Sequence, residues 1–311
     1  MIEHLFVADP VERYHVGKDS TFALMLAAQQ RGHAVWWCDT DGLSADSGTA
    51  RVRCRPIRVQ KVQGDHVACG ETTARDLAEF DAVWMRKDPP FDLDYIAATY
   101  VLDLAPARVW SHPESLRTWN EKTSLLRVPD LAPPTLLARD MATIRAFQVA
   151  VGGSIVLKPL QFSGGAGIVA LHPGDLNTRS LLEMSTQDGR RFVVAQQYLP
   201  AVVEGDKRVI FVDGVARAGL LRVPPPDDLR GNIHIGARVE LAPLTDAETA
   251  LCARLGPSLR AARHLFVGID LIGGRLTEIN VTSPTGIQEI RDLGGPDLAE
   301  ELIDAALARL A

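Results

Sequence analysis

The sequence has little cysteine, no long apolar run and no excess of positive charge, and each of these absences excludes a class of protein. Its four cysteines in 311 residues form no C-x-x-C pair and are too few for a disulfide framework, so we expect free thiols in a reducing compartment. It has no stretch of about 18 apolar residues, the length that a membrane span needs. The net charge of −6 argues against a nucleic-acid partner, because a general nucleic-acid surface is basic.

The start of the sequence lacks the features of a secretory signal. Met1–Pro10 contains no basic segment, and Asp9 comes too early for an apolar signal core. Together with the missing membrane span, this predicts a cytoplasmic protein with no membrane partner. With 46% hydrophobic and 23% charged residues, the chain has the composition of a globular protein of two or three lobes.

The first third of the chain alternates between strand and helix patterns. Short apolar runs predict strands at Leu5–Ala8, Ala34–Cys38 and Ala82–Met85. Between the first two strands, Asp19 or Ser20 can cap a helix that ends near Arg31. This strand–helix–strand order is typical of a parallel α/β lobe.

The segment Arg51–Lys61 is basic, with five Lys or Arg side chains. A nucleic-acid patch is one interpretation. Its arginines alternate, however, as they would on the solvent face of a strand, and Pro56 is typical of a strand at a sheet edge. We therefore favour an exposed edge strand.

The pattern changes after a proline-rich break at Val128–Pro134. It then predicts a helix at Met141–Val149 and three strands at Ile155–Lys158, Ile168–Leu171 and Val193–Leu199. An apolar stripe near the end of the chain predicts a final helix that starts near Asp297. Arg222–Asn232 is polar and rich in proline, so we predict a loop there.

A glycine-rich segment, Gln161–Gly167, joins two of these predicted strands. Loops of this kind can wrap a phosphate, because glycine lets backbone N–H groups approach an anion closely, although such a hairpin can also be purely structural. The segment is not a Walker A loop, and no helix pattern follows it as a dinucleotide fingerprint requires. Lys122 and Lys158 could supply the fixed positive charges that a triphosphate needs, although either alone could be a solvated side chain.

Gly268–Pro284 predicts two strands joined near Gly273 and Gly274. It carries three side chains with hard oxygen atoms, the ligand type that Mg²⁺ prefers: Asp270, Glu278 and Asn280. Glu278 and Asn280 share one strand face because they are two residues apart.

The length of the connecting loop decides whether Asp270 joins them. A two-residue turn would pair Asp270 with Thr277 and put Glu278 on the opposite face. A three-residue loop, Gly273–Arg275, pairs Asp270 with Glu278 and also gives a mostly apolar reverse face. We therefore predict the three-residue loop and a shared metal site. The alternative, an exposed polar hairpin, would leave two opposed carboxylates without a cation.

With these residues in place, the chain resembles prokaryotic glutathione synthetase, of the ATP-grasp superfamily, over nearly its whole length. MRKDPP and TEINVTSPTG are long enough to be specific. The matching segments are KDSTFAL (18–24), MRKDPPFD (85–92), ATYVL (98–102), NEK (120–122), LKPL (157–160), GGAG (164–167), QQYLP (196–200), EGDKRV (204–209), RGN (230–232) and VGIDLIGGRLTEINVTSPTGIQEI (267–290).

The resemblance implies a mixed α/β chain with the ATP-grasp fold. Its expected domains are an N-terminal parallel α/β substrate-binding domain, a small central ATP-grasp lid domain and a C-terminal ATP-grasp domain with the metal site, over residues 1–118, 119–200 and 201–311. The implied reaction joins the carboxylate of γ-glutamylcysteine to glycine through an acyl phosphate and gives glutathione, ADP and phosphate. ATP and two Mg²⁺ ions are the implied cofactors, and a homotetramer is the implied assembly.

The resemblance also implies site residues. Nucleotide binding falls to Lys122, Lys158, Ser163, Gly164, Gly165, Gln196, Gln197, Tyr198, Leu199 and Asp206. The metal ligands are Asp270, Glu278 and Asn280. The reacting phosphoryl and acyl groups would face Arg208, Arg222 and Asn232. The peptide donor and the acceptor would meet Lys18, Ser20, Arg86, Ser283 and Thr285.

The glycine loop departs from the family pattern, in which Asp-Gly stands where this chain has Gln161 and Phe162. Phenylalanine does not adopt positive φ as glycine does, so this half of the loop should be stiffer and bulkier. The glycine loop and the Arg222–Asn232 loop are the two candidate lids over the site, and a second change, Gly236-Ala237 in place of Gly-Gly, falls by the latter. Two alternatives therefore stay open: a related ligase for another acid and amine, and a nucleotide-binding protein without catalysis.

Overall fold

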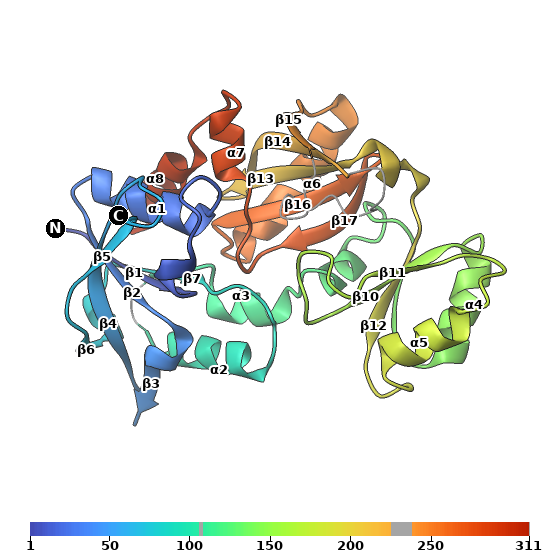
Figure 1. Cartoon of the computed structure of the whole chain (residues 1–311), viewed down its shortest axis with the longest axis horizontal. Coiled ribbons are helices and arrows are strands. Elements are labelled where there is room, and N and C mark those ends of the chain that lie inside the picture. The colour runs from blue at the N-terminus through green and yellow to red at the C-terminus, as the bar shows by residue number, and fades with distance from the viewer. Residues whose placement is uncertain (106–107, 225–237, 311) are drawn as a thin grey trace.

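The computed structural model describes residues 1–105, 108–224 and 238–310 and contains three sheets (Figure 1). The N-terminal and C-terminal sheets lie next to each other, and the central sheet lies at the far end of the long axis. This mixed α/β arrangement confirms the predicted fold class. Each sheet falls inside one predicted domain, and the domain boundaries themselves stay a prediction.

The N-terminal sheet has eight strands, of which β2, β1, β7 and β8 run parallel in that order and confirm the predicted parallel lobe. The strands are β1 (Glu3–Ala8), β2 (Ala34–Cys38), β3 (Leu43–Asp46), β4 (Thr49–Val59), β5 (Val67–Cys69), β6 (Thr73–Asp76), β7 (Ala82–Arg86) and β8 (Arg108–Trp110). The accompanying helices are α1 (Ser20–Gln30), α2 (Leu93–Leu102) and α3 (Pro113–Thr118). As expected, Asp19 caps α1, because its carboxylate accepts from the N–H of Phe22 at 2.8 Å.

Strand β4 confirms one part of its prediction and corrects another. Its buried and exposed residues alternate over most of its length, with Arg51, Arg53 and Arg58 exposed. The edge position was wrong, because β4 pairs with β2, β3, β5 and β6. An eleven-residue strand outlasts its short neighbours, so different parts of it take different partners. Pro56 is tolerated there, and its carbonyl accepts from the N–H of Gly70 at 2.8 Å.

The central sheet is antiparallel, in the order β11-β10-β12-β9, and two helices accompany it. Its elements are β9 (Thr135–Ala138), α4 (Met141–Ala150), β10 (Ile155–Pro159), β11 (Val169–Leu171), α5 (Thr178–Thr186) and β12 (Val193–Gln197). The predicted helix and all three predicted strands are confirmed. The glycine-rich segment connects β10 to β11, which confirms the strand–loop–strand hairpin.

The C-terminal sheet has the order β15-β14-β13-β16-β17. Its strands are β13 (Asp206–Val212), β14 (Val215–Val223), β15 (Arg238–Leu241), β16 (Phe266–Ile272) and β17 (Arg275–Asn280), and its helices are α6 (Asp246–Ala261), α7 (Ile287–Asp292) and α8 (Leu298–Leu310). The loop predicted at Arg222–Asn232 starts too early, because Arg222 and Val223 still pair with β15. Residues 225–232 of that segment, and the following residues to 237, lie outside the described residues. Short 3₁₀ turns occur at Val11–Arg13, Thr40–Gly42, Leu77–Glu79, Thr123–Arg127 and Pro200–Glu204.

The three lobes do not share their cores equally. Buried apolar residues of the N-terminal and C-terminal lobes belong to common clusters, and α8 packs on α1, where Arg31 and Asp304 form an ion pair at 2.9 Å. The buried core around the central sheet draws only on residues 138–195, whereas Leu125, Leu131 and Ala132, which precede that sheet, belong to a cluster shared with the other two lobes. A lobe with its own core can move against its neighbours without exposing much apolar surface.

In the part of the chain that the structure describes, no helix is both long and apolar enough to span a bilayer.

A buried histidine ties three parts of the N-terminal sheet together. His4 of β1 is fully buried, and the indole N–H of Trp84 donates to its Nδ1 at 3.0 Å. Because indole is only a donor, the proton of the neutral imidazole is on Nε2, which can donate to Nδ1 of His33 at 3.0 Å. Burial, with a smaller contribution from His33, lowers the pKa of His4 to about 4.

We predict that His4 makes the stability of the protein depend on pH. The unfolded chain binds this proton below pH 6.5 and the folded chain only near pH 4, so the contribution is complete above pH 6.5 and is lost as the pH falls. Between pH 6.5 and pH 4, His4 should make the free energy of unfolding fall by about 1.4 kcal/mol for each pH unit. Urea unfolding at several pH values, for the wild type and His4→Leu, measures it. Equal pH dependence in both proteins would contradict the assignment.

Candidate active site

The β16–β17 hairpin places the predicted metal ligands side by side. Asp270 pairs with Glu278, and Gly268 pairs with Asn280, as predicted. Paired residues of neighbouring strands point to the same face, so the shared-face prediction is confirmed. Asn280 also donates from Nδ2 to Oδ2 of Asp270 at 3.2 Å.

The predicted three-residue loop is wrong, although the register is right. Ile272 pairs with Arg275, which leaves a two-residue turn of Gly273 and Gly274, both with positive φ. A β-bulge restores the register, because Leu271 pairs with Leu276 and leaves Thr277 as the extra residue. The hydroxyl of Thr277 donates to the carbonyl oxygen of Asp270 at 3.0 Å and stabilises this bulge.

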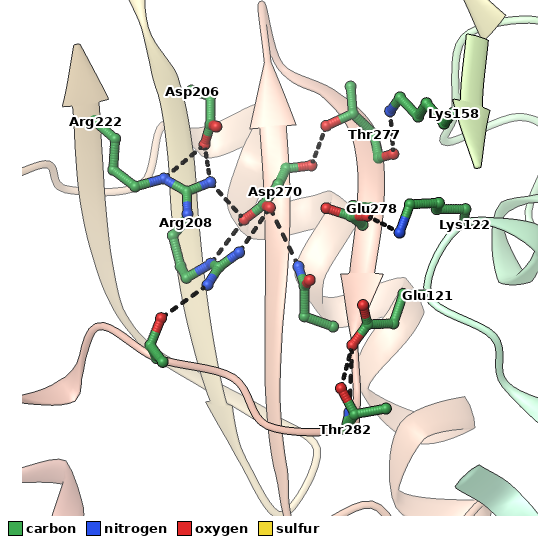
Figure 2. A network of polar contacts seen from close by, with 12 residues as sticks. Glu121, Lys122, Lys158, Asp206, Arg208, Arg222, Asp270, Thr277, Glu278 and Thr282 are labelled. Atoms are coloured by element: carbon green, nitrogen blue, oxygen red, sulfur yellow. Dashed lines mark hydrogen bonds and ion pairs between the residues drawn. The ribbon is translucent and has the colours of Figure 1, made fainter. Parts of the chain in front are cut away.

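Two arginines from neighbouring strands surround the carboxylate of Asp270 (Figure 2). Arg208 of β13 donates from Nε to Oδ1 and from Nη2 to Oδ2, both at 2.8 Å. Arg222 of β14 places Nη2 3.0 Å from Oδ1 and also donates to Asp206. Burial alone would raise the pKa of Asp270, and the two guanidinium groups hold it below its ordinary value.

Asp206 has a different environment from Asp270, although the same Arg222 contacts both. Burial raises the pKa of Asp206 to about 6, and the guanidinium of Arg222 opposes this shift. The site therefore contains one carboxylate that stays ionised and one that can take up a proton near neutral pH.

Lys122 and Lys158 approach the hairpin from the side opposite the arginines (Figure 2). Lys122 lies 3.1 Å from Oε1 of Glu278 and donates to the carbonyl oxygen of Phe162 at 2.7 Å. Lys158 donates to Oε1 of Gln196 at 2.8 Å and to the carbonyl oxygen of Thr277 at 3.1 Å.

The two lysines differ in their charge partners. Burial lowers the pKa of Lys158, and within residues 1–105, 108–224 and 238–310 it has no carboxylate within 4.0 Å. Burial also lowers the pKa of Lys122, but the neighbouring carboxylates, Glu278 and Glu121 above all, together outweigh it, and the net shift is upward. Lys158 is thus a buried ammonium with neutral partners, which suits an anionic ligand.

The glycine loop covers this region with the conformation that its glycines predict. Gly164, Gly165 and Gly167 all have positive φ, and Ser163 accepts from Ala166 in a turn. Phe162 is absent from the residues with positive φ, as expected from its side chain. The carbonyl of Gln161 accepts from the N–H of Phe91 at 3.0 Å, so the loop also contacts the N-terminal lobe.

The residues predicted to lie near a nucleotide base are at the C-terminal end of β12 and directly after it. Gln196 is buried against Lys158. The N–H groups of Gln197 and Tyr198 donate within the protein, to the carbonyl oxygens of Pro134 and Ser154. Among the described residues, the N–H of Leu199 has no acceptor and is the available donor there.

The remaining predicted residues divide between two neighbouring places. Thr285 lies 3.5 Å from Nη1 of Arg208, at the edge of the Asp270 network. Arg86 and Ser20 are buried in the N-terminal lobe, and Arg86 contacts the carbonyl of Pro284, next to Ser283. Lys18 is exposed and the described contacts join it to neither place. Asn232 lies outside the described residues.

Sequence reasoning missed Glu121 as a member of the site. Its carboxylate is buried and accepts from the hydroxyl of Thr282 at 2.6 Å. Burial raises its pKa, and the charge of Glu278 raises it further. Its position beside Lys122 in the NEK motif was the available signal.

The chain matches two family models in succession. Residues 2–117 match the model described as prokaryotic glutathione synthetase, N-terminal domain. Residues 121–295 match the model described as prokaryotic glutathione synthetase, ATP-grasp domain.

Full-length relatives give the same result. The chain is 45% identical to glutathione synthetase of Synechococcus elongatus over 312 residues, which cover 96% of both chains. It is 44% identical to glutathione synthetase of Rhodopseudomonas palustris over 305 residues, which cover 97% of both.

Solved structures share the fold at low sequence identity. D-cycloserine synthetase DcsG superposes with a TM-score of 0.68 at 17% identity over all of both chains. D-alanyl-alanine synthetase A from Vibrio cholerae gives 0.63 at 14% identity over 99% of this chain and 98% of its own. These matches show the fold and no more.

We predict that Asp270 is a stability determinant of the C-terminal lobe. Asp270→Asn leaves two buried guanidinium groups without their main partner and should lower the free energy of unfolding by about 3 kcal/mol. The exposed pair of Arg179 and Glu183 gives the matched control, because Glu183→Gln should cost less than about 0.5 kcal/mol. Urea unfolding without metal or nucleotide measures both. Equal losses of unfolding free energy in the two variants would show that the buried Asp270 pairs stabilise the protein no more than an exposed ion pair does.

Proposed function

Because the chain belongs to the prokaryotic glutathione synthetase family, we propose that it joins the carboxylate of γ-glutamylcysteine to glycine through an acyl phosphate. It is an ATP-dependent ligase that gives glutathione. The observation that carries the proposed site is the meeting of Lys122 and Lys158 with the Asp270–Glu278 pair. Lys158 of the central sheet and Lys122 of the segment beside β17 thus face oxygen ligands of the C-terminal sheet, which is what a metal-bound triphosphate needs.

The nucleotide would lie between the central and C-terminal lobes. Lys122, Lys158 and the loop residues Ser163, Gly164 and Gly165 would contact its phosphates. The N–H of Leu199, beside Gln196, Gln197 and Tyr198, would meet the adenine. Asp206 would accept from the ribose hydroxyls, after its present partner Arg222 moves.

The proposed Mg²⁺ ligands fit the ion by their chemistry. Asp270, Glu278 and Asn280 offer hard oxygen atoms on adjacent strands. Both oxygens of Asp270 already accept from Arg208, Arg222 or Asn280, so ion binding requires at least one of these donors to leave, and we propose that Arg222 does. Two ions held by these residues would offset the negative charge of the phosphates.

When an ion replaces a guanidinium at Asp270, the released arginine becomes available to the reacting groups. A carboxylate is a poor acyl donor until its oxygen is phosphorylated and becomes a leaving group. Arg208 and a released Arg222, with Asn232, would stabilise negative charge on the phosphoryl and acyl oxygens. The acyl phosphate hydrolyses readily, so the glycine loop would have to exclude water while the amine attacks.

The setting of the enzyme follows from family resemblance and composition. We propose that it works in the cytoplasm as a homotetramer on small-molecule substrates, with no nucleic-acid or membrane partner. Gln161 and Phe162 would make one half of the lid less mobile. This change bears on turnover and on substrate choice more than on ATP binding, because Lys122 and Lys158 are unaffected.

We predict that purified protein with ATP, Mg²⁺, γ-glutamylcysteine and glycine forms tripeptide and ADP in equal amounts. Mass spectrometry measures both products, and Glu278→Gln is the matched control that should lose metal-dependent turnover. ADP formed only with other acid and amine pairs would replace the proposed substrates. ATP binding with no turnover for any pair would favour a nucleotide-binding protein without catalysis.

We also predict that Lys158 contributes to ATP affinity without stabilising the empty protein. Lys158→Met should weaken ATP binding by about 10- to 100-fold, because it removes one charged hydrogen-bond donor. The melting temperature without ATP should stay unchanged or rise, since a buried ammonium without a carboxylate is lost. Calorimetric titration and thermal unfolding measure these effects, and the exposed Lys61→Met is the control. A loss of stability with unchanged ATP affinity would contradict the role.

A further inference from the structure

The start of the glycine loop is tied to the rest of the protein by three successive backbone carbonyl groups. Each of them accepts a hydrogen bond from a donor outside the central sheet. The pairs are Leu160 with Nδ2 of Asn120 at 3.2 Å, Gln161 with the N–H of Phe91 at 3.0 Å, and Phe162 with Nζ of Lys122 at 2.7 Å. Because Phe91 belongs to the N-terminal lobe and Lys122 to the segment beside β17, this short stretch docks the central sheet on both.

The side chain of Gln161 is held inside the central lobe. Its Oε1 accepts from Nη1 of Arg191 at 2.7 Å. Pro159 at the end of β10 pairs with Val193 at the start of β12, and the same antiparallel register continued by two residues puts Gln161 opposite Arg191. The side-chain bond therefore extends the pairing of β10 and β12 beyond the strands and fixes where the chain turns into the loop.

Phe162 has a defined place in this docked loop. A side chain at Gly167 would put its Cβ 3.8 Å from Cδ2 of Phe162 and 3.0 Å from Cγ of Pro159, so the ring packs against the far end of the loop, where glycine leaves room. The ring also lines a small cavity together with Phe91 and Trp119. The phenylalanine that stands in place of the family's glycine thus holds the two ends of the loop together beside the docking contact.

Docking leaves Lys122 able to bind a phosphate. In the part of the chain that the structure describes, its ammonium contacts Glu278 and the carbonyl of Phe162 (Figure 2). An ammonium has three N–H donors, so one of them is left for a phosphate oxygen. The loop can therefore be in place before a nucleotide arrives.

Small contributions decide how often the loop is released. The central sheet has its own apolar core, so release exposes little apolar surface. It exchanges the three carbonyl contacts for hydrogen bonds to water, and such an exchange changes the free energy little. The contacts of Arg191 and Phe162 are of the same small size and can therefore set the balance between the docked and released forms.

We propose that Arg191 and Phe162 are positioning residues that keep the glycine loop docked over Lys122 in the empty protein and so exclude water from the acyl phosphate. Arg191 acts through Gln161, and Phe162 acts through its packing against Gly167. Docking is a property of the empty chain, whereas the exclusion of water rests on the proposed function. When water attacks the acyl phosphate, the donor carboxylate is regenerated and phosphate is released, so ATP is consumed without formation of tripeptide.

Hydrogen exchange of the Phe91 amide in the wild type tests docking directly. Pro89 and Pro90 have no N–H, so Phe91 carries the first exchangeable amide after Asp88. Without nucleotide, this amide should exchange at least about 10-fold more slowly than in an unstructured peptide, and a saturating non-hydrolysable ATP analogue should slow it by less than about twofold more. Protection that develops only with the analogue would show that the loop closes on its ligand and would overturn the inference.

Two variants test the positioning residues. Arg191→Ala and Phe162→Gly should each speed exchange of the Phe91 amide by about 3- to 10-fold, because each removes one weak contact of the docked form. The ratio of ADP to tripeptide should rise in both, since it follows the rare released form. ATP affinity should change by less than about twofold, because the docked form still dominates. Exchange mass spectrometry, product analysis and calorimetric titration measure the three quantities.

Matched arginine variants provide the controls. Arg191→Lys can still donate to Gln161 and should restore the wild-type exchange and product ratio. The neighbouring Arg190 donates to the carbonyl of Gln187 and to Asp188 instead. Arg190→Ala should therefore leave both quantities unchanged.

The possible results separate the docked loop from the proposed function. A protected Phe91 amide in a protein that ligates no acid and amine pair keeps the docked loop and overturns the function. Ligation by a wild type with an unprotected Phe91 amide does the reverse. Faster exchange in Arg191→Ala with an unchanged ratio of ADP to tripeptide overturns the positioning role, and so does a large loss of ATP affinity, which would show a general structural defect. Exchange in the wild type decides docking even if a variant does not fold.

Discussion

The site depends on one buried carboxylate, Asp270, and on the charges that hold it in the C-terminal sheet. A carboxylate buried in β16 is stable only with opposite charge beside it, and Arg208 and Arg222 supply that charge from β13 and β14. The pairs cross three adjacent strands and fix the side chains of that face. Under the proposed mechanism, a cation that binds Asp270 displaces an arginine, so the group that stabilises the empty site becomes available to the reacting oxygens.

The lobes meet at this site through polar contacts. Lys122 and Lys158 reach β17 by an ion pair and a hydrogen bond, while the buried apolar core of the central lobe lies within that lobe. The N-terminal and C-terminal lobes instead share their apolar cores. A hinge between a fixed pair of lobes and one independent lobe follows from this difference, because separation then costs few apolar contacts. Lys158 and the glycine loop lie on the independent lobe, whereas Lys122 lies beside β17, where the carbonyl of the adjacent Glu121 accepts from the N–H of Ile279 at 3.0 Å.

The strands and helices were predictable because their signals are local. Apolar runs located β1, β2, β7 and the central strands, and Asp19 marked the start of α1. The hairpin shows where local reasoning ends. The face of Asp270 was correct for an incorrect reason, because a bulge at Thr277 supplied the offset assigned to a longer loop. The predicted edge position of β4 was wrong for a related reason. A single proline such as Pro56 does not indicate how many other strands an eleven-residue strand will pair with.

The sequence by itself determined the fold class, the family and the residues that can hold charge, because these depend on composition, periodicity and motif order. The tertiary structure alone decided their partners. It paired Arg222 with two carboxylates and left Lys158 and Arg86 without one among the described residues. The physical reason is that burial and opposing charge act through space, so residues distant in sequence set whether a charge is satisfied or free to bind a ligand.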